Sequence, residues 1–202
     1  LARLSWDGEV IAMRQPPVQR FGIAGVIPPP GAFLQATKDG EQALTQAVLE
    51  ATQGAKRVVD LFAGSGTFSL PLAQEAEVHA VEGESAMTQA LDQGWRKTSG
   101  LKRVTCEVRD LFRRPLMPDE LKGFDAVVLD PPRAGAEAQV AELAQARPPV
   151  IAYVSCNPVT FARDAKTLID ASYALEWVQV VDQFRWSSHT ELAARFVLNP
   201  AR

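Results

Sequence analysis

The chain has 202 residues, of which 47% are hydrophobic and 22% charged, and its net charge is −3. This composition is typical of a globular domain and excludes collagen-like, disordered and coiled-coil chains. No apolar run reaches the roughly 18 residues of a membrane span, so we expect a soluble protein with no membrane partner. With 21 basic against 24 acidic residues, a chain-wide basic surface for nucleic acid is also excluded, and any such binding has to be local or lie outside these residues.

The chain contains two cysteines, Cys106 and Cys156. Two are too few for a disulfide framework or a cysteine-based zinc site. We therefore expect a reducing, cytoplasmic environment and no bound metal.

The first 30 residues differ from the rest of the chain. Asp7-Gly8 separates two short alternating stretches and predicts a β-hairpin over residues 1–14. Five prolines between Gln15 and Pro30 predict a linker or a surface loop. The chain begins without an initiator methionine, which suggests a fragment of a longer protein. We separate residues 1–30, a hairpin and proline-rich linker, from a main domain of residues 31–202.

The rest of the chain alternates between helical and strand patterns. Apolar side chains at helical spacing predict a helix from Thr37 to Thr52, and short runs rich in β-branched residues then alternate with helical stretches. This order is typical of an α/β fold with a mostly parallel sheet and helices on both faces. A loop without a helical pattern joins the last two strands, so we expect the final strand to be antiparallel. The predicted strands are Arg57–Leu61, Val78–Val81, Val104–Val108, Ala126–Leu129, Val150–Val154, Leu175–Val181 and Ala193–Leu198, and the predicted helices between them are Thr67–Glu75, Ser85–Lys97, Ala136–Ala146 and Pro158–Ile169.

A two-glycine turn follows the first strand of this sheet, where Gly64 and Gly66 let the backbone turn tightly and approach a ligand. Glu82 ends the second strand, where an acidic side chain accepts hydrogen bonds from ribose hydroxyls; the alternative is a solvated acid at a strand end. Ser69 replaces the third glycine of the dinucleotide pattern, which makes a nicotinamide dehydrogenase the least favoured interpretation. The two-glycine turn and Glu82 together suit an adenosyl ligand without a pyrophosphate, namely S-adenosylmethionine.

Two further acidic residues follow the next two strands. Asp110 is placed to reach an adenine amino group, and the alternative is a cap for the turn that follows it. Asp130 begins Asp-Pro-Pro at the carboxyl end of the fourth strand, the edge at which open α/β sheets bind ligands. Base-amino methyltransferases have a similar Asn/Asp-Pro-Pro followed by an aromatic residue. Arg133 stands in that place here, so an exocyclic amine is the less favoured methyl acceptor.

Cys156 lies in Ser-Cys-Asn-Pro at the end of the fifth strand, directly before a helix. A helix N-terminus lowers a thiol pKa, so we interpret Cys156 as a nucleophile rather than a core residue. Glu191 begins the last strand, and a carboxylate near a cysteine suggests a base beside a nucleophile. Cys106 and His79 fall inside predicted strands, and we interpret both as structural.

Together these motifs resemble the RNA 5-methyluridine methyltransferases, which use S-adenosylmethionine to methylate uridine C5 in transfer or ribosomal RNA. The resemblance covers essentially residues 20–202, and DPPRAG combined with SCNP is its most specific part. It implies a Rossmann-like class I methyltransferase fold, with S-adenosylhomocysteine as the product. It also implies that residues 1–30 are the remnant of a preceding domain, and we expect a monomer whose RNA partner binds mainly through N-terminal domains that lie outside this chain. The matching segments are Phe33-Leu34-Gln35, DLFAGSGTFSLPLA, VEG, DPPRAG, SCNPVTFARD and HTE.

The resemblance implies roles residue by residue. Cys156 is the nucleophile and Glu191 the base. Thr67 stands where the family usually has Asn, and its hydroxyl can still bond the cofactor carboxylate. The segment from Phe184 to Glu191 lacks the first histidine of the family pattern, which we expect to alter RNA contacts. The cofactor contacts that it implies are Gln35, Phe62, Thr67, Glu82, Asp110 and Asp130, and the local RNA contacts that we expect are Arg133, Arg163 and Arg185.

The chemistry of uridine C5 methylation requires a thiolate and a base. Uracil C5 is too weak a nucleophile to take a methyl group directly, so a thiolate first adds to C6. The enolate then attacks the methyl group through C5, a base removes the C5 proton, and the thiolate leaves. The target base must also leave its stack to reach such a pocket. The alternatives are a catalytically inactive, RNA-interacting protein and a methyltransferase with a different target.

Overall fold

The structure is a computed structural model that describes residues 2–184, 186–187 and 189–199. The helices are α1 (Lys38–Ala51), α2 (Ser69–Leu72), α3 (Ser85–Arg96), α4 (Glu137–Ala146) and α5 (Pro158–Asp170). The strands of the main sheet are β5 (Arg57–Leu61), β6 (Glu77–Glu82), β7 (Val104–Val108), β8 (Ala126–Leu129), β9 (Val150–Ser155), β10 (Tyr173–Val181) and β11 (Glu191–Leu198). Apart from α2, which has four residues, these elements closely match the predicted ones. Among the described residues, no helix combines the length and apolar character needed to cross a membrane.

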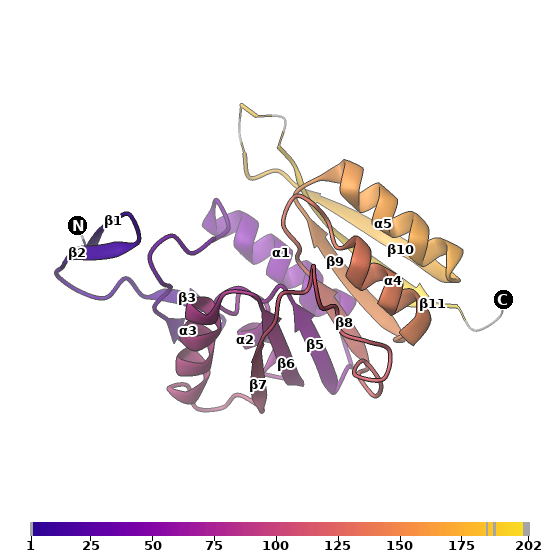
Figure 1. Ribbon diagram of the computed structural model, residues 1–202, viewed down its shortest axis with the longest axis horizontal. Helices are drawn as coiled ribbons and strands as arrows, with labels where there is room; N and C mark the ends of the chain where they lie inside the picture. The colour runs from indigo at the N-terminus through magenta and orange to yellow at the C-terminus, as the bar shows by residue number, and fades with distance from the viewer. Residues whose placement is uncertain (1, 185, 188, 200–202) are drawn as a thin grey trace.

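The seven strands form one sheet in the order β10-β11-β9-β8-β5-β6-β7. Strands β9, β8, β5, β6 and β7 run parallel, and β11 is antiparallel to both β9 and β10 (Figure 1). The predicted α/β class with an antiparallel last strand is therefore confirmed. Because β11 is inserted between β10 and β9, its first residues lie beside the carboxyl end of β9, where Leu192 pairs with Ser155.

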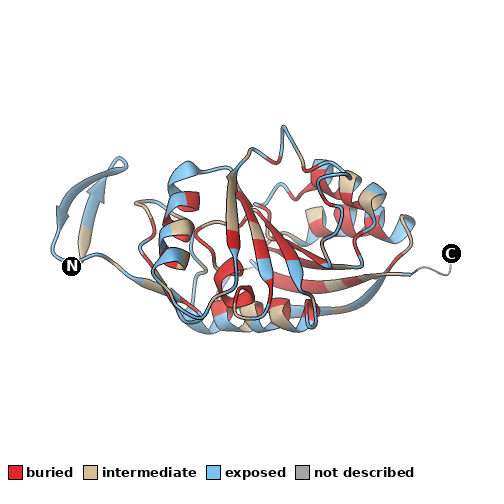
Figure 2. Ribbon diagram, turned by 90° about the horizontal axis from the view of Figure 1, so that it is seen from below, coloured by how far each residue is buried: buried red, intermediate tan, exposed pale blue. Residues whose placement is uncertain are grey.

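Two apolar cores cover the two faces of the sheet. Successive strand residues point to opposite faces, so Val128 joins the core beneath α1 while its neighbours Val127 and Leu129 join the core beneath α4 and α5. Figure 2 shows the buried residues concentrated along the sheet and on the inner sides of the helices. Each fully buried aliphatic side chain contributes about 1.5–3 kcal/mol. The two cores hold the carboxyl ends of the parallel strands at one edge.

The N-terminal residues form two small hairpins. In the first, β1 (Arg3–Trp6) pairs with β2 (Glu9–Met13) through a turn at Asp7 and Gly8 with φ of 48° and 81°, which confirms the predicted hairpin. Figure 1 shows it projecting from the body of the molecule.

The second hairpin, of β3 (Gln19–Phe21) and β4 (Ala24–Val26), corrects the predicted loop between Gln15 and Pro30. Phe21 and Val26 are almost fully buried in the core that α1 and α3 cover. The five prolines flank these three-residue strands instead of interrupting them. Whether residue 30 separates two domains remains a prediction.

Candidate active site

A cavity of about 680 Å³ opens at the carboxyl edge of the sheet. Its volume falls within the roughly 300–1,000 Å³ of small-molecule sites. Residues that end or follow β5, β6, β7, β8 and β9 contribute to its wall, as expected for an open α/β sheet. Nine of the ten predicted site residues line it, namely Gln35, Phe62, Gly64, Thr67, Glu82, Asp110, Asp130, Cys156 and Glu191.

The two glycines of the turn after β5 have different surroundings. Gly64 has a φ of +56°, and no atom lies within 4 Å of the place where a Cβ would stand, so the backbone there is open to a ligand. Gly66 has a φ of +99°, and an added Cβ would lie 2.9 Å from Leu91 Cγ and 3.0 Å from Leu70 Cδ1. The cavity does not reach Gly66. Gly66 therefore allows the turn to pack on α3, whereas Gly64 faces the cavity.

The Glu82 carboxylate is fixed by the backbone. One oxygen accepts a hydrogen bond from Gly64 N at 2.9 Å, and the other accepts one from Glu84 N at 2.8 Å. Each carboxylate oxygen retains a lone pair for a further donor. Glu82 is therefore an oriented acceptor in the cavity wall rather than a freely solvated acid.

Aromatic rings form another part of the wall. Phe62 adopts a left-handed φ of 65°, which is uncommon for a residue with a side chain, and its ring lies 5.4 Å from that of Phe112. Asp110 accepts hydrogen bonds from the backbone N–H of Phe112 at 3.0 Å and of Arg113 at 3.2 Å. Asp110 thus caps its turn, as one of its two sequence interpretations had it, and it also lines the cavity.

Negative charge accumulates around this cavity. Burial, followed by the nearby carboxylates of Glu191, Asp60 and Glu82, raises the pKa of Asp130 well above its usual range. Asp60 is fully buried below the turn and accepts a hydrogen bond from Ser69 Oγ at 2.5 Å. Its other oxygen has no partner among the described residues, and burial raises its pKa to about 7. Such unbalanced acids favour a cationic ligand.

Cys156 and Glu191 meet at the other end of the cavity because β11 lies beside β9. Burial raises the pKa of the Glu191 carboxyl, while a hydrogen bond from Gln183 and the positive charge of Arg133 oppose that rise. Burial also raises the pKa of the Cys156 thiol, the charges of Glu191 and Asp130 add to the rise, and Arg133 opposes it. The expectation of a lowered thiol pKa is therefore wrong for this state, because burial and two carboxylates outweigh the helix terminus.

The loop after β8 is held against the start of α5. Asn157 caps this helix by accepting a hydrogen bond from Val159 N at 3.0 Å, and its Nδ2 donates to the Arg133 carbonyl at 2.9 Å. The Arg133 guanidinium donates to His189 Nδ1 at 3.2 Å. Arg133 is thereby held on the rim beside Cys156.

Two further residues, Arg163 and Arg185, are expected to contact RNA, and the structure describes only Arg163. Arg163 pairs with Glu137 at 3.1 Å and Asp164 at 2.8 Å, which ties it to neighbouring structure. Arg185 lies outside the described residues. RNA contact by either residue remains a prediction.

Several residues of the site were not predicted from the sequence. Phe33, Met87 and Phe112 line the cavity, and Gln183 bonds to two of the predicted residues. Phe33 lies within a segment that matches the family, whereas the only sequence signal of the other three was nearness to a motif. Among the described residues, no group of three or more His, Cys, Asp or Glu is arranged to hold a metal ion.

Comparison with known proteins identifies the family. Residues 99–197 match the model of the family described as tRNA (uracil-5-)-methyltransferase. An uncharacterised RNA methyltransferase of Mesorhizobium japonicum is 55% identical over 193 residues, which are 96% of this chain and 47% of that protein. The 23S rRNA (uracil(1939)-C(5))-methyltransferase RlmD of Shewanella halifaxensis is 37% identical over 84% of this chain and 38% of its own length. Residues 99–197 therefore belong to the tRNA (uracil-5-)-methyltransferase family, and the similarity to these relatives extends over most of the chain.

A solved structure agrees with this membership of the tRNA (uracil-5-)-methyltransferase family. The tRNA (uracil-54, C5)-methyltransferase of Pyrococcus abyssi, crystallised with S-adenosyl-L-homocysteine, matches with a TM-score of 0.81 and 28% identity over 94% of this chain and 47% of that one. The resemblance inferred from the motifs is confirmed. The chain spans about half the length of the curated relatives it matches. The segment that matches the family model includes Asp110, Asp130, Cys156 and Glu191, whereas the glycine turn and Glu82 precede it.

Proposed function

We propose that this chain is the catalytic part of an enzyme that transfers a methyl group from S-adenosylmethionine to C5 of a uridine in tRNA or rRNA. The observation that carries the proposal is that one cavity joins Cys156 and Glu191 to Asp130 and Glu82. The related RlmD and the Pyrococcus abyssi enzyme, both named as uracil-C5 methyltransferases, support it.

The residues present fit an adenosyl cofactor. Glu82 offers oriented acceptors for the ribose hydroxyls, and Phe62 with Phe112 offers apolar surface for the adenine. Gly64 leaves room for close backbone approach. When bound, S-adenosylmethionine supplies an electrophilic methyl group on a cationic sulfonium. The acids around Asp130 provide the negative potential that this cation requires.

Cys156 acts as the nucleophile. Its thiolate adds to C6 of the uracil and forms a carbon–sulfur bond, and the electron pair of the C5–C6 double bond becomes an enolate. The guanidinium of Arg133 favours the thiolate. C5 would then accept the methyl group that bound S-adenosylmethionine supplies, with S-adenosylhomocysteine as the leaving group.

Glu191 acts as the base. After methyl transfer C5 still carries its proton, which the Glu191 carboxylate accepts. The electron pair of the broken C–H bond re-forms the C5–C6 double bond, and the Cys156 thiolate is expelled. Because burial raises the pKa of Glu191, its carboxylate is a stronger base than an exposed glutamate.

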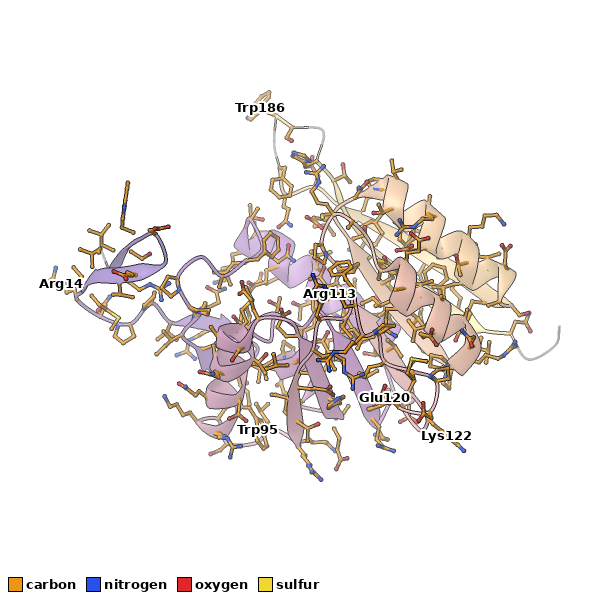
Figure 3. All side chains as sticks on the ribbon, viewed as in Figure 1. Arg14, Trp95, Arg113, Glu120, Lys122 and Trp186 are labelled. Carbon is orange, nitrogen blue, oxygen red and sulfur yellow. The ribbon has the colours of Figure 1, made fainter. Side chains whose placement is uncertain are left out.

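RNA reaches this cavity at the rim that Arg133 lines. The target uridine leaves its stack to enter. Figure 3 shows Trp186 at the tip of the loop between β10 and β11, where its side chain is fully exposed. With a net charge of −3, this chain supplies little of the phosphate attraction that RNA binding requires. We therefore assign most of the affinity for a cytoplasmic RNA substrate to parts of the protein outside it.

The proposal is tested with the complete gene product. Calorimetry with S-adenosylhomocysteine measures cofactor binding, and incubation with S-adenosylmethionine and unmodified tRNA or rRNA, followed by mass spectrometry of the nucleosides, identifies the product. We expect binding and 5-methyluridine. Binding without methylation of either RNA would favour the inactive alternative, and methylation of an exocyclic amine would contradict the assignment of Cys156.

A further inference from the structure

Gln183 is a buried amide that connects separate parts of the chain. It lies directly after β10 and is 7% exposed. Its Nε2 donates a hydrogen bond to Gln35 Oε1 at 2.7 Å, and its Oε1 accepts one from Thr37 N at 3.4 Å. Both partners belong to the segment that leads into α1, and Gln35 lines the cavity.

A glycine makes room for this amide. Gly40 is buried in the first turn of α1, where helical backbone requires no glycine. A Cβ at this position would lie 2.2 Å from Gln183 Oε1 and 2.9 Å from its Cδ. The helix surface is therefore shaped around the Gln183 side chain, which accounts for a residue that otherwise weakens a helix.

The same amide also reaches Glu191. Burial raises the pKa of the Glu191 carboxyl, and a side-chain hydrogen bond from Gln183 opposes that rise. Only the amide nitrogen can donate it, and a primary amide has two hydrogens, which suffice for Gln35 and Glu191 together. Gln183 thus contacts one residue assigned to the cofactor and the residue assigned as base.

We propose that Gln183 is a positioning residue that orients Gln35 for the cofactor and Glu191 for proton removal at the same time. Because the Gln35 oxygen is occupied by Gln183, the NH₂ group of Gln35 is the half left for a ligand. A donor suits the carboxylate end of the cofactor. The inference rests on the proposed function. It adds one residue, Gln183, that positions both the cofactor-binding Gln35 and the proposed base Glu191.

The test is Gln183→Met in the complete gene product, which keeps the length of the side chain and removes its hydrogen bonds. We expect affinity for S-adenosylhomocysteine to fall about 5- to 20-fold, the loss of roughly one charge-assisted hydrogen bond. Glu191 loses a donor that favours its ionised form, so the acid limb of the kcat–pH profile shifts to higher pH. The KM for RNA stays within twofold.

Two variants complete the design. Gly40→Ala displaces Gln183 without removing its amide, and we expect the same two changes from it. Gln139→Met is the matched control, because Gln139 is 1% exposed and its amide makes two hydrogen bonds with the Leu116 backbone, away from the cavity. We expect it to lower thermal stability and leave both cofactor affinity and the pH profile unchanged.

The outcomes separate this inference from the proposed function. If wild type binds S-adenosylhomocysteine but Gln183→Met and Gly40→Ala change neither affinity nor pH profile, Gln183 is merely structural and the inference is overturned. If both effects also appear in Gln139→Met, they arise from general destabilisation, and the inference is again overturned. A wild-type protein that does not bind S-adenosylhomocysteine contradicts the proposed function itself.

Discussion

Charged residues line two cavities of the molecule. In one cavity the acids pair with a basic residue, whereas in the other the acids have further acids as neighbours. Glu107 and Glu120 line the cavity of about 340 Å³ beside β6 and β7. Each pairs at 2.6 Å with Arg109, which belongs to the wall of the other cavity, and His79 bonds to Glu107 at 3.3 Å. Arg109 lowers the pKa of Glu120 to about 2. At the carboxyl edge, by contrast, burial raises the carboxyl pKa of Asp130, and the neighbouring acids Glu191, Asp60 and Glu82 add to the rise.

The difference separates structure from ligand binding. A charge that meets its counterion within the chain holds elements together, whereas a buried acid among other acids favours its protonated form unless a cation arrives from outside. We therefore assign the cavity at the carboxyl edge to a cationic cofactor. The cavity beside β6 and β7 is assigned to structural ion pairs.

The two cysteines give the largest expected contrast. Cys156→Ala removes the proposed nucleophile, and we expect methylation by the complete gene product to fall on the order of 10⁴-fold or more. Cys106 lies in β7, and burial raises its pKa to about 11. Cys106→Ala is therefore expected to change the rate less than about threefold at most, as for a substitution outside the site. Equal losses in the two variants, measured by methyl incorporation, would remove the distinction.

Glu82 and Glu120 form the next contrast. Glu82→Ala removes an oriented acceptor, and a hydrogen bond to a charged group is worth about 1.5–3 kcal/mol, so we expect roughly 10- to 100-fold weaker binding of S-adenosylhomocysteine. Glu120→Ala removes one of the two carboxylates that hold Arg109 in the cavity wall, but Glu107 still pairs with Arg109, so this affinity is expected to stay unchanged. Calorimetry measures the affinity of both variants for S-adenosylhomocysteine. Wild-type affinity in Glu82→Ala would refute the ribose contact.

The positive charge of the cofactor allows a third test, with a smaller expected effect. Burial raises the pKa of the Cys156 thiol, and the charges of Glu191 and Asp130 add to the rise. A cation bound beside these two carboxylates is therefore expected to lower the thiol pKa. We compare S-adenosylhomocysteine with an analogue that has a protonated amine in place of the sulfur. The rate of Cys156 alkylation at pH 7 is expected to rise several-fold with the cationic analogue, with Cys106 as an unreactive internal reference. Equal rates with both ligands would argue against the charge coupling.

The ion pair of Glu120 beside β6 and β7 gives the smallest expected effect. The pKa of Glu120 is about 2 against an ordinary value of 4.5, so its pair stabilises the fold above pH 4.5 and that contribution is lost as pH falls toward 2. The Glu120 side chain is 36% exposed, and solvent screening limits the effect to about 1 kcal/mol. We expect Glu120→Gln to lower the urea midpoint at pH 7 and to match wild type more closely at pH 3. A difference that grows as pH falls would have the wrong sign.

Local patterns in the sequence were enough to predict the sheet and most of the site. Runs such as Arg57–Leu61 and Ala126–Leu129 coincide with strands because burial on both faces demands continuous apolar residues. Asp130 and Cys156 were placed together because parallel strands end at one edge. The hairpin of β3 and β4 was missed because three-residue strands have too little periodicity to detect.

Features that depend on packing were not predictable in this way. The pKa of the Cys156 thiol is raised by burial and then by carboxylates from β11 and the loop after β8, which no local pattern brings together. The role of Gln183 depends on contacts with residues near position 36 and on the gap at Gly40. The spacing of residues along the sequence predicts neither the thiol pKa nor the role of Gln183.

The most direct test of the proposed chemistry is the fate of RNA on Glu191→Gln in the complete gene product. This variant keeps the shape of Glu191 but accepts no proton, so methyl transfer proceeds and release stalls. We expect a methylated RNA adduct on Cys156 that survives denaturing electrophoresis and is located by peptide mass spectrometry. Normal turnover by Glu191→Gln, or an adduct that persists when Cys156→Ala is added, would contradict the assignment of nucleophile and base.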